Sequence, residues 1–256
     1  MRYAIQWLRS VVFIAQMYLA LAVIGLVSIP FAIVRVDWAQ ATIHRYCAWV
    51  RWTAGWMVGI KSEVRGEIPQ GAALIAAKHQ SFLDILLIYD ALPQARFVMK
   101  KELLRMPVLG WYSQRIGCIP VDRGKRGQAI QAMVTAAQDG QHPGGQLIIF
   151  SQGTRVAPGA YLPYKVGTGI LYDRLGMPCV PVAVNVGVFW PKRSLYRKPG
   201  RAVIEFLAPI PPGLALRPFM ERLEADIEGN SNRLMAEAGF DVPAMPPPPE
   251  GRSDRM

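Results

Sequence analysis

The pattern of hydrophobic and polar positions divides the chain into two parts. Between Arg9 and Arg35 run 25 residues without a charged side chain, and a helix of that length exceeds the roughly 30 Å hydrocarbon core of a bilayer. From Lys61 onward, short apolar runs alternate with segments of helical period. The pattern predicts a membrane-seating helical segment over residues 1–60, followed by an α/β domain over residues 61–240.

A second N-terminal segment, Trp38 to Ile60, is less apolar but rich in aromatic residues. At about 100° per residue, five of its rings fall within roughly a third of a helical turn, while His44 and Arg51 point the other way. The five are Trp38, Tyr46, Trp49, Trp52 and Trp56. Because Trp and Tyr prefer the headgroup level, the pattern favours a helix at the membrane surface or folding back toward it; the alternative is a stripe packed on the protein's own core.

Arginines flank the first apolar segment on both sides, so the distribution of positive charge does not fix an orientation. A single span and a two-helix hairpin embedded in one leaflet both fit. A cleaved signal peptide fits less well, because the apolar run continues another dozen residues beyond the small residues at Ala20 to Ala22.

The α/β domain is expected to contain a central, mostly buried β-sheet flanked by helices. Its buried strands are predicted at Ala73 to Ala77, Ile116 to Val121, Leu147 to Phe150, Val180 to Val184 and Ala202 to Leu207. Helices are predicted at Ser81 to Tyr89, Lys101 to Ser113, Gln128 to Gln138, Val166 to Leu175 and Arg217 to Ala238. The proline-rich residues 241–256 are predicted to be disordered.

Composition adds a concentration of positive charge. The 256 residues are 52% hydrophobic and 18% charged, which excludes a disordered or fibrous protein, and the net charge of +11 is gathered in two stretches. Residues 96–126 carry +6 and residues 191–201 carry +5, which indicates recognition of an anion beside a membrane leaflet. The tryptophans are not interleaved with these stretches, so a nucleic-acid partner is not expected.

The cysteines and histidines do not suggest a metal site. Cys47, Cys118 and Cys179 are odd in number and far apart, which is typical of reduced, buried thiols. The three histidines, at positions 44, 79 and 142, are isolated from one another.

Ligands of open α/β sheets gather at the carboxyl ends of strands, and His79 and Asp84 follow the strand that ends at Ala77. Ser81 and Asp84 resemble a capping box, which would place Asp84 near the loop that holds His79. An acid beside an imidazole fixes its tautomer and leaves the other nitrogen free to take a proton from a hydroxyl. The alternative is a surface histidine next to a routine helix cap.

A second candidate group follows the strand ending at Phe150. Gly153 would let backbone approach a ligand, and Thr154 and Arg155 supply a hydroxyl and a guanidinium, as an oxyanion or phosphate site requires. Lys100 and Arg123, in the first basic stretch, could reach the same mouth. The alternatives are a plain strand-to-loop connection and a solvated basic face.

Taken together and in this order, these residues resemble the four-block signature of the glycerolipid acyltransferase family. The matches are His79 and Asp84 in the first block, Lys100 before Gly117 and Arg123 in the second, Phe150 with Gly153 to Arg155 in the third, and Val180 to Ala183 in the fourth. The resemblance covers roughly residues 64–207, and the apolar hairpin also resembles the family's membrane-seating helices. Ser151 and Gln152 depart from it, because the family usually has proline and glutamate there; a role that needs a carboxylate at position 152 is therefore in doubt.

The resemblance implies transfer of a fatty acyl group from a thioester to the sn-2 hydroxyl of 1-acylglycerol 3-phosphate, producing phosphatidic acid. It implies that His79 is the general base and Asp84 its orienting partner. The phosphate would be held by Arg155, Arg123, Lys100, Gly153 and Thr154, and Pro181 would line an acyl or substrate pocket. Direct attack without an acyl-enzyme is favoured, because no serine or cysteine lies in a nucleophile-elbow context.

The same resemblance implies no cofactor and no metal, with acyl-CoA or acyl carrier protein as the acyl-donor substrate. The partners would be the lipid bilayer and the lysophospholipid acceptor, and the location the inner membrane with the active site on its cytoplasmic face. Residues 191–201 could serve an acidic carrier protein, anionic lipid or the phosphates of coenzyme A. Two alternatives remain: another acceptor, such as a lyso-ornithine lipid or glycerol 3-phosphate, and a non-catalytic module that binds anionic lipid.

Overall fold

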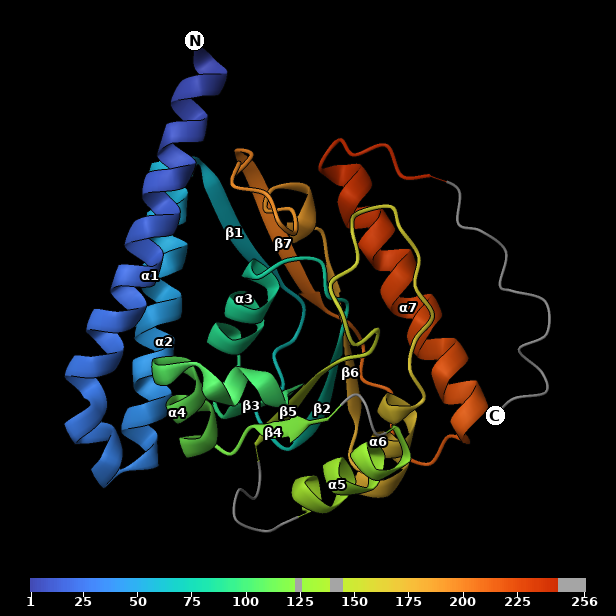
Figure 1. Cartoon of the computed structure of the whole chain (residues 1–256). Coiled ribbons are helices and arrows are strands. Elements are labelled where there is room, and N and C mark those ends of the chain that lie inside the picture. Colours follow the sequence, from blue (N-terminus) through green and yellow to red (C-terminus); the bar gives the residue numbers. More distant parts are fainter. Residues whose placement is uncertain (123–125, 139–144, 244–256) are drawn as a thin grey trace.

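The computed structural model describes residues 1–122, 126–138 and 145–243, with the backbone alone for residues 126–129. A central seven-stranded sheet carries helices on both faces (Figure 1). This architecture confirms the expected α/β class with a central sheet flanked by helices and an apolar N-terminal hairpin. Of the predicted disordered tail, residues 244–256 lie outside the described residues.

The sheet brings the carboxyl ends of its five parallel strands to the same side. Strands β2 to β6 run parallel to one another. Strand β7 is antiparallel to β6, and the outermost strand, β1, pairs in parallel with β7. The order is β1-β7-β6-β2-β5-β3-β4, with bounds β1 (Ile60–Arg65), β2 (Ala73–Ala77), β3 (Ala95–Lys100), β4 (Ile119–Val121), β5 (Gln146–Phe150), β6 (Cys179–Val184) and β7 (Gly200–Phe206). The loops after β2, β3 and β5 therefore meet at one edge, where open α/β sheets bind ligands.

Two layers of helices cover the sheet. One face carries α1 (Arg2–Val34), α2 (Val36–Thr53), the π-helical turn η1 (Ala54–Val58), α3 (Leu83–Ala91), the 3-10 turn η2 (Lys101–Arg105) and α4 (Pro107–Arg115). The other carries α5 (Arg126–Gln138), α6 (Gly167–Leu175) and α7 (Leu216–Glu237); a short turn, η3 (Val186–Val188), follows β6. Ile75 and Ala77 pack in the first layer and Leu74 and Ala76 in the second, as alternation along a buried strand requires.

Some predicted boundaries are wrong, and two strands were missed. The strand predicted from Ile116 begins only at Ile119, because Ile116 ends α4 and Gly117 turns the chain at φ 76°. The helix predicted to reach Ile60 ends at Gly59, where a left-handed φ of 75° stops it, and Ile60 begins β1. The strands β1 and β3 were not predicted at all, because charged residues interrupt their apolar pattern.

The two N-terminal helices form a hairpin that rests on the α/β body. A single residue, Arg35, is extended (φ −137°, ψ 137°) and separates α1 from α2, which lie side by side in Figure 1. Near one end of α1, Gln6 Nε2 donates to the carbonyls of Val58 and Arg197, at 2.9 and 2.8 Å. These bonds fix the first turns of α1 to segments far away in sequence.

The other half of α1 is fixed to α4. The Tyr112 hydroxyl donates to the carbonyl of Gly25 at 2.8 Å, and the Arg115 guanidinium donates to the carbonyls of Ala32 and Ile33, each at 2.9 Å. Gly25 permits this approach, since a Cβ there would lie 2.3 Å from Val108 Cγ1. Helix α1 therefore contacts the body along most of its length.

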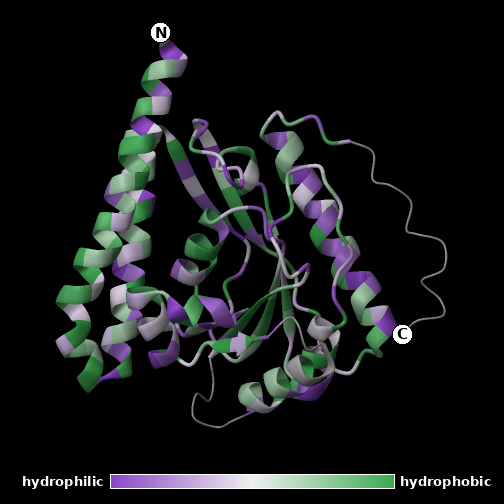
Figure 2. Cartoon of the chain, in the orientation of Figure 1, coloured by the Kyte–Doolittle hydropathy of each residue, from purple (hydrophilic) through white to green (hydrophobic). Residues whose placement is uncertain are grey.

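The outward side of the hairpin is apolar. Figure 2 shows hydrophobic colouring over most of α1, and among the described residues α1 is the helix long and apolar enough to cross a membrane. Trp52 and Trp56 are 60% and 57% exposed, and Trp38 and Trp49 are exposed as well, so these four rings do not pack into the protein's own core. Placing Tyr46 on this exposed face was wrong: it lies about 80° from Trp38 around the helix and is buried.

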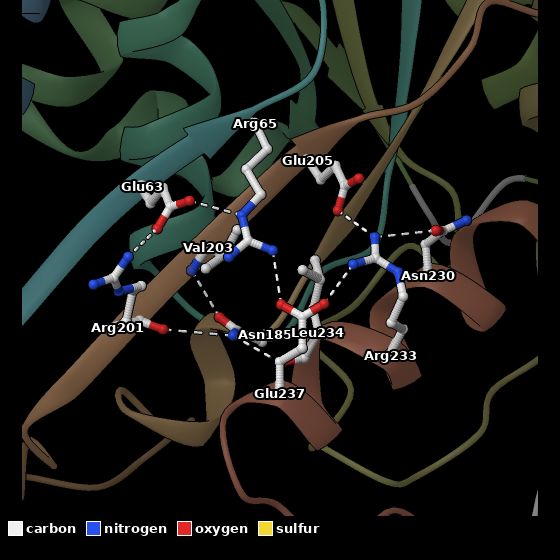
Figure 3. A network of polar contacts seen from close by, with 10 residues as sticks. All are labelled: Glu63, Arg65, Asn185, Arg201, Val203, Glu205, Asn230, Arg233, Leu234 and Glu237. Carbon is white, nitrogen blue, oxygen red and sulfur yellow. Dashed lines mark hydrogen bonds and ion pairs between the residues drawn. The ribbon is translucent and has the colours of Figure 1, made fainter.

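A polar network ties the far edge of the sheet to α7 (Figure 3). Glu63 on β1 accepts hydrogen bonds from Arg65 at 2.7 Å and from Arg201 on β7 at 2.9 Å. Glu237, at the end of α7, accepts from Arg65 at 2.7 Å and from Arg233 at 2.6 Å. These charges link α7 to β1 and β7, the two strands that lie on the opposite side of β6 from β2 and β5.

Candidate active site

His79 and Asp84 form a hydrogen-bonded pair in the loop after β2. His79 Nδ1 lies 2.9 Å from Asp84 Oδ1. The other oxygen of Asp84 accepts the backbone N–H groups of Gln80 at 2.7 Å and Ser81 at 2.8 Å, which confirms the expected reach back from the first turn of α3. Ser81 Oγ in turn accepts the backbone N–H of Leu83, at 3.2 Å.

These contacts define the orientation of the imidazole. Asp84 is fully buried and accepts hydrogen bonds, so the proton of the neutral ring belongs on Nδ1. The His79 ring also stacks on Phe150, with ring centroids 3.9 Å apart and planes inclined by 18°. The side chain of His79 is 13% exposed, and no described residue hydrogen-bonds to its Nε2. That nitrogen is therefore available to a ligand.

The turn after β5 lies directly beside this loop. The backbone N–H of Val156 donates to the carbonyl of His79 at 2.7 Å, and that of Ser151 donates to the carbonyl of Ala77 at 3.3 Å. Gly153 has a left-handed φ of 69°, which a residue with a side chain adopts at a cost. The structure thus brings His79 and the predicted turn Gly153 to Arg155 together at one edge of the sheet.

Cationic groups surround this turn. Arg155 is half-buried, and within the described part of the chain its guanidinium forms no ion pair; Thr154 beside it is exposed. The Lys192 ammonium, from the second basic stretch, donates to the carbonyl of Arg155 at 3.0 Å. Lys165 lies against Gly153, since a Cβ on Gly153 would be 3.0 Å from Lys165 Nζ. The turn therefore combines a close backbone approach with positive charge, as an anionic ligand requires.

Three further residues were predicted to belong to the site, and each lies in a different part of the chain. Lys100 is exposed at the end of β3 and shares the edge of the sheet with the loops after β2 and β5. Arg123 lies outside the described residues. Pro181 is buried within β6, opposite Ala76 on β2 and just before β6 begins to pair with β7. The roles of these residues stay predictions.

A comparison of the chain with known protein families agrees with this geometry. Residues 60–185 match the family model described as Acyltransferase. This region of the chain belongs to the acyltransferase family. The matched acyltransferase region begins at β1, ends just past β6, and includes both loops of the site.

Curated relatives and a solved structure resemble the acyltransferase. A 1-acyl-sn-glycerol-3-phosphate acyltransferase of Pseudomonas aeruginosa is 29% identical over 160 residues, which cover 62% of each chain. The 1-acyl-sn-glycerol-3-phosphate acyltransferase alpha of Mus musculus is 30% identical over 163 residues, covering 61% of this chain and 57% of that protein. The matched part of this chain thus spans about three fifths of the length of these relatives.

The crystal structure of the 1-acyl-sn-glycerophosphate (LPA) acyltransferase from Thermotoga maritima has the same fold. Its TM-score is 0.77, with 92% of this chain and 100% of that chain covered at 19% sequence identity. Most of the N-terminal hairpin is included in this similarity, because the part of the chain that the match leaves uncovered is much shorter than the hairpin.

The thiols of this acyltransferase are poorly suited to act as nucleophiles. All three cysteines are free and buried, as predicted. Burial raises the pKa of Cys118 to about 11 and also raises that of Cys179, so both stay protonated at neutral pH. Of the described residues, no three His, Cys, Asp or Glu side chains form a group that could hold a metal ion.

Three polar residues that support the acyltransferase site were not predicted from the sequence, and a fourth, Gln152, was noted only as a departure from the family pattern. Lys78, Gln152, Tyr164 and Glu228 form a buried cluster beneath the two loops. The sequence does contain a signal for this cluster. Lys78 directly follows an apolar strand, and Glu228 interrupts the apolar side of the last helix. Charged residues in such places are buried only when they are paired.

Proposed function

We propose that the protein transfers a fatty acyl group from an acyl thioester to the sn-2 hydroxyl of 1-acylglycerol 3-phosphate, producing phosphatidic acid. The observation that carries this proposal is the His79–Asp84 pair, with Nε2 of the imidazole unoccupied by any described residue, beside the turn of Gly153 to Arg155. A base and an anion site at one edge suit an acceptor that carries a hydroxyl and a phosphate. The names of the relatives from Pseudomonas aeruginosa and Mus musculus support the same acceptor.

The proposed reaction is direct acyl transfer through a tetrahedral intermediate, without an acyl-enzyme. His79 Nε2 takes the proton of the acceptor hydroxyl while its oxygen attacks the thioester carbonyl, and the resulting imidazolium is stabilised by Asp84. Collapse of the tetrahedral intermediate breaks the carbon–sulfur bond, and the thiolate takes the proton from Nε2. The products are the new ester and a free thiol. The raised pKa of Cys118 and Cys179 supports this route over a cysteine acyl-enzyme.

The acceptor phosphate is assigned to the cationic turn. Arg155 and Lys100 supply positive charge, Thr154 supplies a hydroxyl, and Arg123 is the further expected ligand. Gly153, whose own N–H donates to the carbonyl of Phe150 at 2.8 Å, lets the backbone of the turn approach the phosphate closely. A guanidinium binds two phosphate oxygens at once, which makes Arg155 the main anchor in this proposal. Coenzyme A and acyl carrier protein are both candidates for the acyl donor.

The bilayer is the proposed partner of the hairpin. Because α1 is bound to the body near both ends, through Gln6 and through Arg115, we assign it to one leaflet rather than to a span that leaves the body behind. Its exposed apolar side and the exposed tryptophans of α2 would enter that leaflet. The proposed location is the inner membrane, with the active site on the cytoplasmic face, where acceptor and product need never cross water.

A purified assay tests the proposal directly. Acyl-CoA and acyl carrier protein donors are crossed with 1-acylglycerol 3-phosphate, glycerol 3-phosphate and a lyso-ornithine lipid in detergent micelles. We expect turnover to be highest with 1-acylglycerol 3-phosphate, and His79→Ala to lower it by about 10³-fold, of the order expected when a general base is removed. His44→Ala is the matched control, because His44 is a half-buried histidine that faces Asp90 instead of the site.

The outcomes separate the alternatives. Near-normal turnover by His79→Ala would rule out the base assignment. Faster reaction with an acceptor that lacks a phosphate would assign another substrate, since a site that binds phosphate loses affinity when its charged partner is missing. Lipid binding without turnover by the wild type would indicate a non-catalytic membrane module.

A further inference from the structure

A buried cluster of polar side chains lies beneath the two loops of the site and takes no part in the proposed reaction. We call the four residues Lys78, Gln152, Tyr164 and Glu228 the buried clamp. Lys78 and Glu228 form an ion pair, with side chains only 1% and 4% exposed. Gln152 is buried completely and Tyr164 almost completely. Buried charges of this kind persist in proteins only when they are paired.

Glu228 is the centre of the clamp. Its Oε2 pairs with Lys78 Nζ, while its Oε1 accepts the Tyr164 hydroxyl at 3.0 Å and Gln152 Nε2 at 3.4 Å. Burial, followed by the nearby Glu228 carboxylate, raises the pKa of Tyr164 well above its usual value, so its hydroxyl stays a donor. Gln152 Nε2 also donates to the carbonyl of Leu162 at 3.1 Å.

The members of the clamp adjoin both halves of the site. Lys78 immediately precedes His79, and Gln152 immediately precedes Gly153. One carboxylate on α7 is therefore bonded to the residue before the base and to the residue before the anion-binding turn. A displacement of Glu228 would move both loops, including the hydrogen bond between Val156 and the carbonyl of His79.

The energetics favour a role in positioning. A buried ion pair adds little net stability compared with apolar residues of similar size, but removing one partner leaves an uncompensated charge in the interior. The pair is therefore better explained by the fixed geometry that it imposes. A shared carboxylate tolerates one arrangement of its three donors, because each must stay within hydrogen-bonding distance.

We propose that Glu228 is a positioning residue that sets the placement of His79 relative to the turn of Gly153 to Arg155, through Lys78 and Gln152. This inference rests on the proposed function for its activity readout. Glu228 does not touch the substrate; its single negative charge, shared between the two loops, holds them in register.

The first test compares Glu228→Gln with Ile227→Ala. Ile227 is its buried neighbour on α7, packs in the hydrophobic core and lacks a polar side chain, so its truncation lowers stability without touching the clamp. Assayed where both variants are folded, Glu228→Gln should lower kcat at least tenfold and raise KM for 1-acylglycerol 3-phosphate. Ile227→Ala should stay within twofold of the wild type in both constants.

Exchanging the charge between the two positions gives a second test. Gln152→Glu alone places a second carboxylate against that of Glu228 and should lower kcat. The double variant Gln152→Glu with Glu228→Gln restores one carboxylate and one amide, and should recover at least fivefold of the kcat lost in Glu228→Gln. A milder variant, Tyr164→Phe, keeps the charges and removes one hydrogen bond. It should lower kcat and raise KM in the same directions as Glu228→Gln, but by a smaller factor. It replaces Glu228→Gln in the test if that variant does not fold.

Hydrogen exchange gives a readout that needs no turnover. In Glu228→Gln, peptides covering residues 78–84 and 151–156 should both exchange faster, and Ile227→Ala should leave them unchanged. Three results would each overturn the proposal. They are unchanged hydrogen exchange in Glu228→Gln, a kcat of Glu228→Gln within twofold of the wild type, and no recovery of kcat in the double variant Gln152→Glu with Glu228→Gln. An inactive wild type would instead refute the proposed function, while the exchange measurement would still decide on the clamp.

Discussion

The imidazole of His79 lies flat against the ring of Phe150, with centroids 3.9 Å apart and planes inclined by 18°. Because Phe150 closes one face of the imidazole and Asp84 binds Nδ1, the ring has little freedom to rotate. If His79 acts as the proposed base, this fixed orientation keeps the lone pair of Nε2 directed at the acceptor hydroxyl.

Phe150→Leu should therefore lower kcat by about tenfold while changing KM less, because a misplaced base affects the chemical step more than binding. Steady-state kinetics in micelles measure this effect. Phe97→Leu, which replaces the next ring in the stack, removes a similar area without touching His79 and should keep at least half of kcat. Equal losses in the two variants would contradict an orienting role for Phe150.

Two carboxylates on α3 offer a matched comparison. Asp84→Asn should lower kcat by about 10²-fold or more, because a neutral amide no longer stabilises the imidazolium. Asp90→Asn removes the partner of Arg51 and His44, so it should cost about 1 to 3 kcal/mol of unfolding free energy and leave kcat unchanged. Urea denaturation and kinetics on both variants check this; a normal kcat in Asp84→Asn would exclude the proposed pair.

The network of Figure 3 predicts sensitivity to acid. Hydrogen bonds from Arg65 and Arg201 lower the pKa of Glu63, and hydrogen bonds from Arg65 and Arg233 lower that of Glu237. Each contribution to stability is therefore complete above the pKa of the unfolded chain, about 4.3, and is lost as the pH falls through the lower folded value.

Urea midpoints measured between pH 7 and pH 3 should fall as the pH falls below about 4.3. The fall should be shallower in Glu237→Gln than in the wild type. Glu221→Gln, which removes an exposed carboxylate from an ion pair with Arg217 on the same helix, is the control and should leave the slope unchanged. Parallel slopes in wild type and Glu237→Gln would contradict the assignment.

The exposed tryptophans Trp52 on α2 and Trp56 on η1 predict affinity for lipid. Replacing Trp52 and Trp56 by serine should weaken binding to anionic phospholipid vesicles by ~10- to 100-fold, because each ring contributes on the order of 1 kcal/mol when it leaves water. Vesicle sedimentation measures the partition. Val166→Ala, which truncates an exposed apolar residue beside α6, is the control; an equal effect would show that the loss is not specific to the two tryptophans.

Local signals predicted the parts of the fold that depend on neighbours in sequence. The uncharged run gave α1, the apolar runs gave β2, β5 and β6, and the capping pattern of Ser81 and Asp84 placed the carboxylate near His79. The strand β3 was not predicted because its sequence, ARFVMK, mixes charged and apolar residues. Five of its six residues are not fully buried.

Contacts between distant segments could not be predicted in the same way. The ring of Phe150 reaches His79 only because β2 and β5 are neighbours in the sheet, and Glu228 reaches Lys78 across 150 residues of chain. The sequence contains both charges but does not state that they meet. Their pairing depends on how α7 packs over β6, which is a property of the finished fold.

The bonds that hold α1 also order its assembly in time. Its partners follow late in the chain, Tyr112 by 87 residues after Gly25 and Arg197 by 187 residues after Ser10. At a synthesis rate of about 5 to 20 residues per second, the apolar helix would wait roughly 10 to 40 s for its last partner. An apolar helix left in water for that interval would aggregate. In the proposed membrane location, the bilayer would bind α1 first and the α/β body would bind it second.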